Sequence, residues 1–559
     1  MEPGSRPRGS PAQLAGRTLA NLAGFVRDAA VAPFAYRISR EWLALRLDLG
    51  VAEAPRRSWL WRTSVLPAPG PLANVLEALR LAAGDARVRG VFVRVGRGPI
   101  GWAQVASLAR ALTRVRESGR KLVVYAEATG NAGAWLGGLA DHFWMAPAGR
   151  LDLLGIRVES IFLRGALDRL RIRPEVLSAG RYKSLGEMLD RDSMSPEARE
   201  ALEAIVDDFY AALVDGLAAG KAGDVDRAGR WIDGGPYLAA EALEQGIVDD
   251  LVYGDEIPTR LAELGGAPVP PAGQELPKAQ PIGEAAYLRL ARRRFVWTPI
   301  SQGPAQIAVV PVLGLIRPGA GSPRGVVGTL RRLERSDSVR AVVLRVDSPG
   351  GDPLASDLIW RATRKLAERK PVVASLGNRA ASGGYYVAMG ANEIVAEEAT
   401  LTGSIGVVLA GLAFEELLAG VGVSSESIQR GKHAGIYSTM APRSEEERGV
   451  LQRHVDGLYE RFAGNAADSR NLSRSDLEEV AEGRVWSGRR ASQNKLVDLL
   501  GGLELALERA ETLAGLERGE GVPLYCAPQG AGFARLLPSQ PLDRVAGAQL
   551  WCPIRVELA

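Results

Sequence analysis

Short apolar runs, each bounded by glycine, proline or charged residues, recur along the chain and predict buried strands. The clearest runs are residues 87–95 and 339–346, both rich in valine. Each is followed by a stretch with helical spacing of its apolar residues, at 105–115 and 355–366. Strands that alternate with helices through short connections indicate an α/β protein with largely parallel sheets.

The order of these elements repeats after about 250 residues, a period typical of a duplicated domain and too long for a solenoid repeat. In both halves a leader strand comes first, and the helix is followed by a second strand and a glycine-rich helix. Both halves also end on a similar Gly-Arg motif. The matched segments are 42–49 with 306–315, 122–126 with 372–376, and Gly229-Arg-Trp-Ile-Asp-Gly with Gly483-Arg-Val-Trp-Ser-Gly.

The repeat divides the chain into two copies with flanking segments. A stretch rich in proline, glycine and alanine separates the copies and has the composition of a linker. The predicted boundaries are a leader at 1–40, a first copy at 41–264, a linker at 265–304, a second copy at 305–515 and a tail at 516–559.

Composition narrows the class of protein. A hydrophobic content of 46% and a charged content of 24% fit a folded chain, and the net charge of +4 is small for 559 residues. No basic run is interleaved with aromatic residues, which argues against nucleic acid as a partner. Cys526 and Cys552 show neither a disulfide framework nor the spacing of metal ligands, so a buried, inert role is expected.

No apolar run reaches the roughly 20 residues needed to cross a bilayer. The leader has the pattern of a weakly amphipathic helix, with Leu19, Leu22 and Val26 among its apolar positions. Such a helix either lies on a membrane surface or packs against the rest of the protein.

Candidate chemistry appears at Ser382, which the pattern places at the junction of a strand, a turn and a helix. The unpaired N–H groups of a helix start stabilise negative charge there, so the position suits a nucleophile. The alternative is a small residue kept for packing or capping. The first copy supplies a comparison, because its sequence aligns Ala132 with Ser382.

A nucleophilic serine needs a base. The first copy carries Lys183 where the second carries Ala434, so one copy has the serine and the other the lysine. A desolvated lysine can act as the base, and Lys183 is our candidate, with a surface cation as the alternative. His433 is a second contender for the base, because it lies in the second copy's version of the lysine loop.

Acyl transfer also needs donors for an oxyanion. The segment Asp347-Ser-Pro-Gly-Gly-Asp352 follows a predicted strand, and its glycines can aim N–H groups at a site or simply form a turn. Ser404 either holds the base by a hydrogen bond or is a turn residue.

Four motifs together resemble signal peptide peptidase A, or protease IV, in its long tandem bacterial form. They are Tyr182-Lys-Ser184, Asp347-Ser-Pro-Gly-Gly351, Ala380-Ala-Ser-Gly-Gly-Tyr385 and Thr400-Leu-Thr-Gly-Ser-Ile-Gly406. The resemblance covers about residues 41–515 and implies two Clp-protease/crotonase-like α/β domains. It also implies a dyad of Ser382 as nucleophile and Lys183 as general base. Ser404 would position the lysine amine, and Gly351 and Gly383 would form the oxyanion hole.

The same resemblance implies a bowl-shaped homotetramer that cleaves released signal peptides in or near the inner membrane without a cofactor or metal. The long form usually carries an N-terminal transmembrane anchor, which residues 1–34 do not show. We therefore expect peripheral membrane attachment or a cytoplasmic location.

The function predicted from the sequence is a serine endopeptidase that degrades signal peptides and other short apolar peptides. Tyr385 and Tyr386 are candidates for its substrate pocket, with core packing as the alternative. The competing functions are a crotonase-type enzyme acting on acyl-CoA, which would share the oxyanion hole, and a non-catalytic membrane-associated scaffold.

Overall fold

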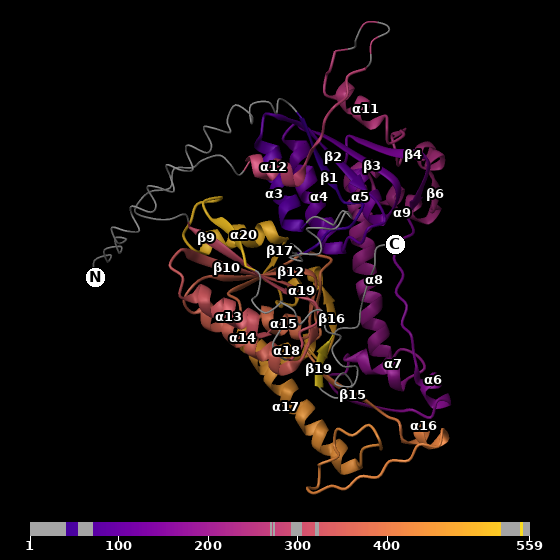
Figure 1. Ribbon diagram of the computed structural model, residues 1–559, viewed down its shortest axis with the longest axis vertical. Helices are drawn as coiled ribbons and strands as arrows, with labels where there is room; N and C mark the ends of the chain where they lie inside the picture. Colours follow the sequence, from indigo (N-terminus) through magenta and orange to yellow (C-terminus); the bar gives the residue numbers. More distant parts are fainter. Residues whose placement is uncertain are drawn as a thin grey trace, which may run out of the picture.

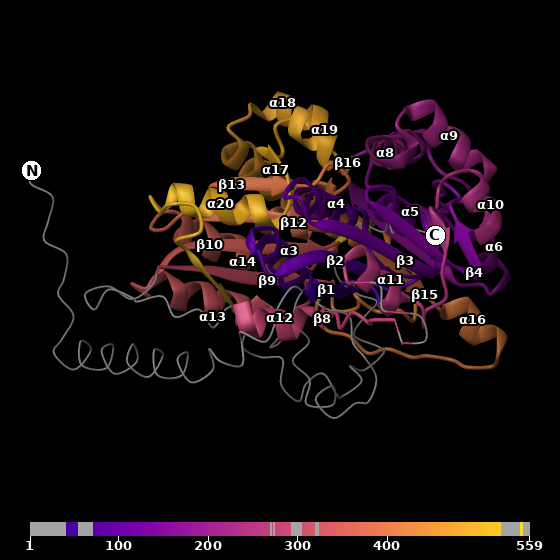
Figure 2. The same cartoon turned by 90° about the horizontal axis from the view of Figure 1, so that it is seen from above.

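A computed structural model describes residues 41–53, 71–268, 271, 274, 276–291, 305–318, 323–526 and 548–551. Two α/β domains lie side by side, as Figures 1 and 2 show, and each is built on its own sheet. The predicted leader at 1–40 and Cys552 fall outside the described residues. Among the described residues, no helix has both the length and the apolar character needed to cross a membrane.

The first domain is built around a mainly parallel sheet in the order β6-β4-β3-β2-β1-β8, with β7 beside β4. Its central strands are the valine-rich runs, whose side chains are buried. The strands are β1 (Glu41–Arg46), β2 (Val88–Val95), β3 (Lys121–Gly130), β4 (His142–Asp152), β6 (Tyr237–Leu238), β7 (Asp250–Leu251) and β8 (Ile282–Gly283).

Helices cover this sheet and several begin at capping side chains. In α8 the hydroxyl of Ser195 accepts from the N–H of Ala198, and Pro196 occupies the first helical position. The helices of the first domain are α3 (Leu72–Gly84), α4 (Trp102–Glu117), α5 (Asn131–Gly138), α8 (Pro196–Leu217), the π-helix η2 (Ala218–Ala222), α9 (Val225–Gly234), α10 (Ala239–Glu244), α11 (Ile257–Leu264) and α12 (Glu284–Ala291).

The second domain repeats the arrangement with the strand order β16-β14-β12-β10-β9-β18, and β13 joins β12 to β17. The bounds are β9 (Gln306–Leu313), β10 (Val339–Ser348), β12 (Val372–Ala381), β13 (Glu393–Ala396), β14 (Leu401–Gly403), β16 (Val485–Ser487), β17 (Leu499–Leu500) and β18 (Val522–Tyr525). The predicted α/β class, two tandem domains with largely parallel sheets, is confirmed.

The helices of the second domain also begin at capping side chains. Asp352 caps α14, and Ser444 with Glu447 forms a capping box at the start of α17. The helices are α13 (Pro323–Glu334), α14 (Pro353–Ala367), α15 (Gly383–Ala388), α16 (Glu415–Gly420), α17 (Glu445–Arg470), α18 (Arg474–Val480), α19 (Gly488–Gln493) and α20 (Leu503–Leu513).

An arm of the first domain crosses to the second. It contains α6 (Arg164–Arg169), β5 (Arg173–Ala179), the 3₁₀ turn η1 (Ser184–Gly186) and α7 (Glu187–Asp190). Strand β5 pairs antiparallel with β15 (Val407–Ala413) of the second domain over seven residues. A third sheet results, in the order β11 (Gly350–Gly351), β19 (Ala548–Trp551), β15 and β5. This sheet brings the lysine-bearing loop of one copy to the serine of the other.

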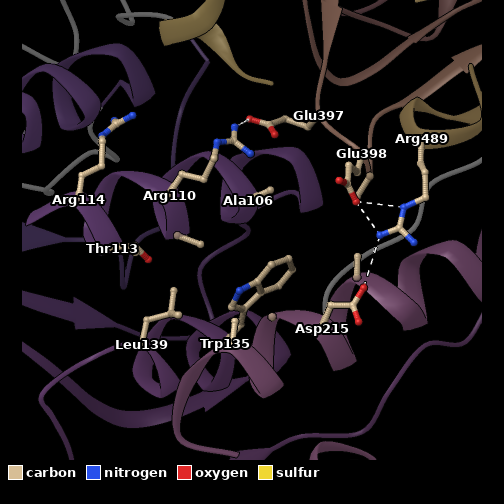
Figure 3. A pocket seen from close by; sticks show the side chains of 15 residues that line it. Ala106, Arg110, Thr113, Arg114, Trp135, Leu139, Asp215, Glu397, Glu398 and Arg489 are labelled. Carbon is tan, nitrogen blue, oxygen red and sulfur yellow. Dashed lines mark hydrogen bonds and ion pairs between the residues drawn. The ribbon is translucent and has the colours of Figure 1, made fainter. Parts of the chain in front are cut away.

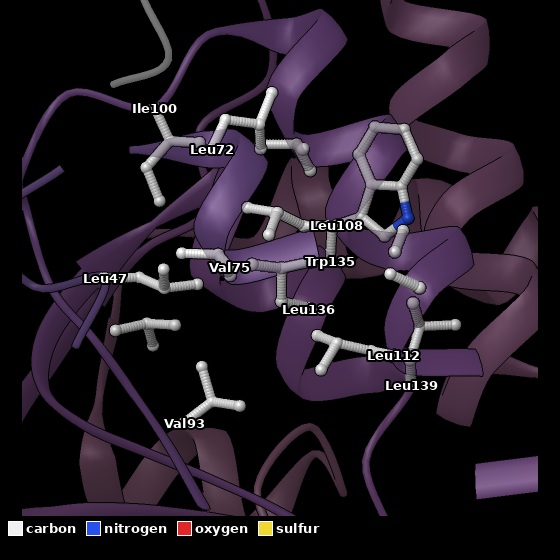
Figure 4. Close-up of a cluster of buried hydrophobic side chains, with 14 of the residues drawn as sticks. Leu47, Leu72, Val75, Val93, Ile100, Leu108, Leu112, Trp135, Leu136 and Leu139 are labelled. Atoms are coloured by element: carbon white, nitrogen blue, oxygen red, sulfur yellow. The ribbon is translucent and has the colours of Figure 1, made fainter. Parts of the chain in front are cut away.

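The two domains also share one hydrophobic core. The cluster drawn in part in Figure 4 joins residues of α3, α4 and α5, among them Leu108, Leu112 and Leu136. It continues into the second domain through Val343, Val373 and further residues of that sheet and of α20. Continuous close packing fixes the placement of one domain against the other.

Two predicted segments differ from the structure. The predicted linker at 265–304 includes β8, which pairs with β1, and α12, whose Tyr287 and Leu288 are buried against the first domain. The predicted tail at 516–559 contributes β18 to the second sheet and β19 to the third. The first of these segments carries buried apolar groups in a composition that otherwise resembles a loop, and the second joins the sheets by pairing of its backbone. Cys526 is buried, as predicted, and its burial raises the pKa of the thiol.

Candidate active site

Ser382 lies directly after β12 and is the N-cap of α15, which confirms the predicted strand–helix junction. Its φ of 55° is a strained value for a residue with a side chain, of the kind found where a nucleophile is presented on a sharp turn. Its N–H donates to the carbonyl of Gly403 at 2.8 Å, and the residue is fully buried. The strand and helix therefore hold the hydroxyl in one orientation.

Lys183 reaches this hydroxyl from the other copy. It follows β5, is only 5% exposed, and its Nζ donates to the Oγ of Ser382 at 2.8 Å. The sequence separation is 199 residues, and the contact depends on the pairing of β5 with β15. The distance lies within the range required between a general base and its nucleophile.

Ser404 is the third group of the cluster. Nζ of Lys183 donates to the Oγ of Ser404 at 2.9 Å and to its carbonyl at 3.0 Å. Ser404 has a φ of 54° and is buried, and its own N–H donates to the carbonyl of Arg484. Two oxygens of one fixed residue thus orient the amine toward Ser382.

Gly351 and Gly383 meet beside the nucleophile. A Cβ built on Gly383 would lie 3.2 Å from the nitrogen of Gly351, so the two backbones are in close contact. Gly351 has a φ of +148°, and a Cβ there would lie 1.9 Å from the carbonyl oxygen of Ile316. Only glycine fits this position. Gly383 is the first residue of α15, where N–H groups have no partner within the helix.

Tyr385 and Tyr386 follow Ser382 on α15 and pack in the core of the second domain. Both rings are buried, at 0% and 3% exposure, and both belong to the core of the second domain. The Tyr385 hydroxyl donates to the carbonyl of Leu496, and the Tyr386 hydroxyl donates to Asp357. A helix that follows a buried strand places most of its side chains in the core, and these contacts are those of core packing, the alternative for both residues.

A turn at residues 482–484, which the candidate site motifs did not include, holds the lysine loop in place. The N–H of Tyr182 donates to the carbonyl of Glu482 at 2.8 Å. A Cβ on Gly483 would lie 2.6 Å from the nitrogen of Lys183, and Gly483 has a φ of +84°. The guanidinium of Arg484 lies 4.8 Å from the ring centroid of Tyr182. The Gly-Arg motif that ends both copies is the sequence signal that could have identified this turn.

A buried cluster of charged side chains lies at the start of the glycine-containing segment 347–352. Arg345 donates to Glu53 of the first copy at 2.9 Å, and both side chains are buried. Asp347 lies beside them and accepts from the N–H of Arg379. Burial, and then the charge of Glu53, raises the pKa of the Asp347 carboxyl to about 7. Among the described residues, no group of three or more His, Cys, Asp or Glu side chains is placed to hold a metal.

The two remaining sequence candidates lie elsewhere. His433 is in a loop near Glu446 and Glu447 at the start of α17, and Lys183 takes the place beside the serine that a base requires. Asn131 follows β3 directly, as Ser382 follows β12, and Ala132, which the sequence aligns with Ser382, is the next residue.

Comparison with known proteins follows the same division of the chain. The model of "Peptidase family S49" matches residues 114–267 and 364–517, two segments with the spacing of the repeat. "Serine protease SPPA, chloroplastic" from Arabidopsis thaliana is 34% identical over 464 residues, which are 81% of this chain and 67% of that protein. "Protease 4" of Salmonella typhi is 31% identical over 465 residues, 80% of this chain and 72% of that protein.

"Protease 4" of Haemophilus influenzae is 28% identical over 500 residues, 84% of this chain and 78% of that protein. The two family matches together cover more than half of the chain, and they fall one in each of the two domains. The chain therefore belongs to peptidase family S49, as a tandem serine endopeptidase of the SppA or Protease 4 type.

Proposed function

We propose that Ser382 and Lys183 form the catalytic dyad of this peptidase, with Ser404 as the residue that positions the lysine. The observation that carries the proposal is the 2.8 Å contact between Nζ of Lys183 and Oγ of Ser382 in a buried setting. Removal of an amine from water favours its neutral form, which can accept a proton. A lysine base needs such a setting, because a fully hydrated ammonium holds its proton at neutral pH.

The reaction then runs in two halves. Lys183 takes the proton of Ser382, and Oγ attacks the carbonyl carbon of the peptide bond. The N–H groups of Gly351 and Gly383 stabilise the negative oxygen. The lysine ammonium passes its proton to the leaving nitrogen, which departs as an amine and leaves an ester on Ser382. Water, deprotonated by Lys183, attacks the ester, releases the acid and restores both side chains.

The substrates that we propose are signal peptides and other short apolar peptides in extended form. Support comes from the third sheet, where β19 lies between β11 and β15 and pairs with both. Strand β11 is Gly350–Gly351 itself, and β15 begins three residues after Ser404. A strand laid in this place passes beside the proposed dyad, and strand addition binds a peptide through its backbone.

We propose a homo-oligomer, with a tetramer as the expected size. Within the chain, β5 of one copy pairs with β15 of the other. The segments in the corresponding places, 153–163 and 424–430, have no strand and expose Ile161 and Ile428 at 71% and 93%. The same contact made between chains would cover them, and such head-to-tail contacts repeat until a ring closes. Light scattering on the purified chain measures the mass, and a monomer would contradict the proposal.

A fluorophosphonate probe tests the dyad directly. It should label the native chain at Ser382 and leave Ser382→Ala unlabelled, and hydrolysis of a fluorogenic apolar peptide should fall to the background rate. Ser356→Ala is a matched control, because Ser356 is also buried next to Gly383 but its hydroxyl donates to the carbonyl of Asp352. Labelling that persists in Ser382→Ala would contradict the assignment of the nucleophile.

A further inference from the structure

Two parallel helices, α13 and α14, form an outer face of the second domain. They connect β9 to β10 and β10 to β12, three strands that pair side by side and parallel. Right-handed connections of this kind place both helices on the same side of the sheet. Their apolar residues belong to the core of that domain, and the helices lie next to one another in Figure 1. Their remaining positions therefore make one continuous outward face.

Every charged side chain that is exposed on these two helices is basic. The six exposed cations are Arg324, Arg331, Arg332, Arg361, Arg364 and Lys365. None of their side chains makes an ion pair or a hydrogen bond with a residue that the structure describes. The two carboxylates of the helices are less exposed and already paired, Glu334 with Arg369 and Asp357 with Arg461.

The turns that follow the helices keep this balance. They add two exposed carboxylates and three exposed arginines: Asp337, Glu368, Arg335, Arg340 and Arg369. The face formed by α13 and α14 therefore remains basic at its border.

The cavity between the two domains shows the opposite arrangement, because its cations face carboxylates. In Figure 3, Arg489 lies between Glu398 and Asp215, and Arg110 pairs with Glu397. Those arginines are neutralised within the chain. The cations of α13 and α14 are left for a partner outside it.

Helix α8 of the first domain carries the opposite charge. Its exposed charged side chains are one arginine and four carboxylates, namely Arg199, Glu200, Glu203, Asp207 and Asp215. Figures 1 and 2 both place α8 well away from α13. The small net charge of +4 thus conceals an uneven distribution. A negatively charged surface would attract the protein with α13 and α14 toward it.

Two exposed leucines lie on the same face as the cations. Leu354 is 65% exposed and Leu358 is 50% exposed. Together with Arg361 and Lys365 they follow the helical spacing that puts side chains on one side of α14. Apolar groups beside cations are typical of a surface that enters the headgroup layer of a bilayer.

The same face lacks the aromatic groups on which a nucleic-acid site stacks its bases. Trp360 is the one aromatic residue of the two helices, and its ring packs against Tyr386. Two parallel helices also present a broad face and not a groove. Both observations favour a lipid surface over a nucleic acid as the partner.

We propose that the face formed by α13 and α14 binds the surface of an anionic lipid bilayer. The six cations lie at the level of the lipid phosphates, and Leu354 and Leu358 enter the boundary with the acyl chains. The proposal concerns a peripheral contact, made by the folded second domain itself.

This orientation brings the proposed site to the bilayer. Helix α14 begins two residues after Gly351, and Leu354 lies in its first turn. An apolar peptide that leaves the bilayer would therefore meet the proposed oxyanion hole close to the membrane surface. That consequence rests on the proposed function. The lipid contact rests on the face alone, and its measurement requires no peptide hydrolysis.

Sedimentation of the full chain with lipid vesicles tests the proposal. We expect binding to vesicles of phosphatidylglycerol and phosphatidylcholine in equal parts, little binding to phosphatidylcholine alone, and release at high salt. A variant that combines Arg331→Gln, Arg332→Gln, Arg364→Gln and Lys365→Gln should bind about tenfold more weakly or less. All four side chains are exposed, and circular dichroism verifies that the variant is folded.

The matched control removes the same charge from exposed positions elsewhere. It combines Arg80→Gln, Arg169→Gln, Arg230→Gln and Arg453→Gln, and it should bind vesicles as the native chain does. An equal loss in both variants would mean that net charge alone attracts the chain to lipid. Unchanged binding in the first variant would assign the contact to another part of the chain. Either result would overturn the proposal.

A further variant separates lipid from nucleic acid. Leu354→Ser with Leu358→Ser keeps every cation, and it should weaken vesicle binding severalfold because less apolar area enters the bilayer. Duplex DNA is the competing probe. Vesicle binding that this variant leaves unchanged, together with DNA binding that the loss of the four cations abolishes, would overturn the proposal in favour of a nucleic-acid site.

Discussion

The two copies can be compared residue by residue around the strand that ends at the site. Where the second copy has Ser382, the first has Asn131, and where the second has Ser404, the first has Leu153. Asn131 is buried and bonds to the backbone, since its Oδ1 accepts from Leu154 and its Nδ2 donates to Gly155. Leu153 is fully buried in the shared core. In the first copy, both side chains at these positions are therefore bonded or packed within their own domain.

The difference shows how one site can be built from two equivalent domains. The first copy keeps its sheet and carries Asn131, which bonds to the backbone of its own domain, directly after its strand β3. It contributes instead the arm that carries Lys183 across to β15. The proposed dyad therefore takes its lysine from one copy and its serine from the other.

The largest effect is expected from Lys183→Met. The change keeps an unbranched side chain in a buried place and removes the proposed base, so peptide hydrolysis should fall by about 10²–10⁴-fold. Lys221→Met is the control, because Lys221 is another first-copy lysine that pairs with Asp249 away from the serine. Hydrolysis of a fluorogenic peptide measures the rates of the two variants. Equal activity in the two variants would mean that the first copy does not supply the base.

A smaller effect is expected from the turn at residues 482–484, through Gly483→Ala. The new Cβ would press on the backbone of Lys183 at a φ that alanine disfavours, and it would shift the amine from its position. We expect kcat to fall about tenfold with little change in KM. Gly457→Ala, within α17 and with open space around it, should leave kcat unchanged. A fall in stability without a fall in kcat would make the turn merely structural.

Asn131→Ala should have the reverse effect, a loss of stability with little loss of activity. Loss of two buried hydrogen bonds should cost about 1–3 kcal/mol in the free energy of unfolding. Hydrolysis by the folded variant should stay within about twofold of the native rate, because Asn131 holds only backbone in its own copy. Urea titration and the peptide assay give the two numbers. A large loss of turnover in the folded variant would show that the first copy takes part in chemistry beyond Lys183.

The mildest prediction concerns Asp347 and pH. Its pKa is about 7 in the folded chain, against an ordinary value near 3.8, so the folded state holds this proton more tightly than the unfolded state. The contribution of this proton to the free energy of unfolding is fully present at low pH, and it is lost as the pH rises through 7. Between pH 6 and 8 the native chain should lose about 1 kcal/mol that Asp347→Asn does not lose. Unfolding curves at both pH values check this, and parallel losses would contradict it.

Much of this arrangement could be predicted from the sequence, because strand patterning and a 250-residue repeat are properties of contiguous segments. The alternation of strands and helices gave the fold class. The complementary presence of Ser382 and Lys183 predicted a shared site, and the structure brings the two side chains into contact.

What the sequence could not give were contacts between distant segments. The pairing of β5 with β15 joins two runs with no mutual signal in one sequence. The segment that composition assigned to a linker holds β8 and α12, because burial of Tyr287 and Leu288 outweighs a loop-like composition. Tyr385 looked like a site residue by its nearness to Ser382 along the chain, but helix geometry turns it into the core.

The separation of 199 positions between Lys183 and Ser382 has a consequence during synthesis. The ribosome releases the first domain before the nucleophile exists as a peptide, and the nucleophile emerges before its own domain can close. A nascent chain that ends before Ser382 carries the proposed base without the proposed nucleophile. The proposed dyad is therefore complete only after both domains have been synthesised and packed together.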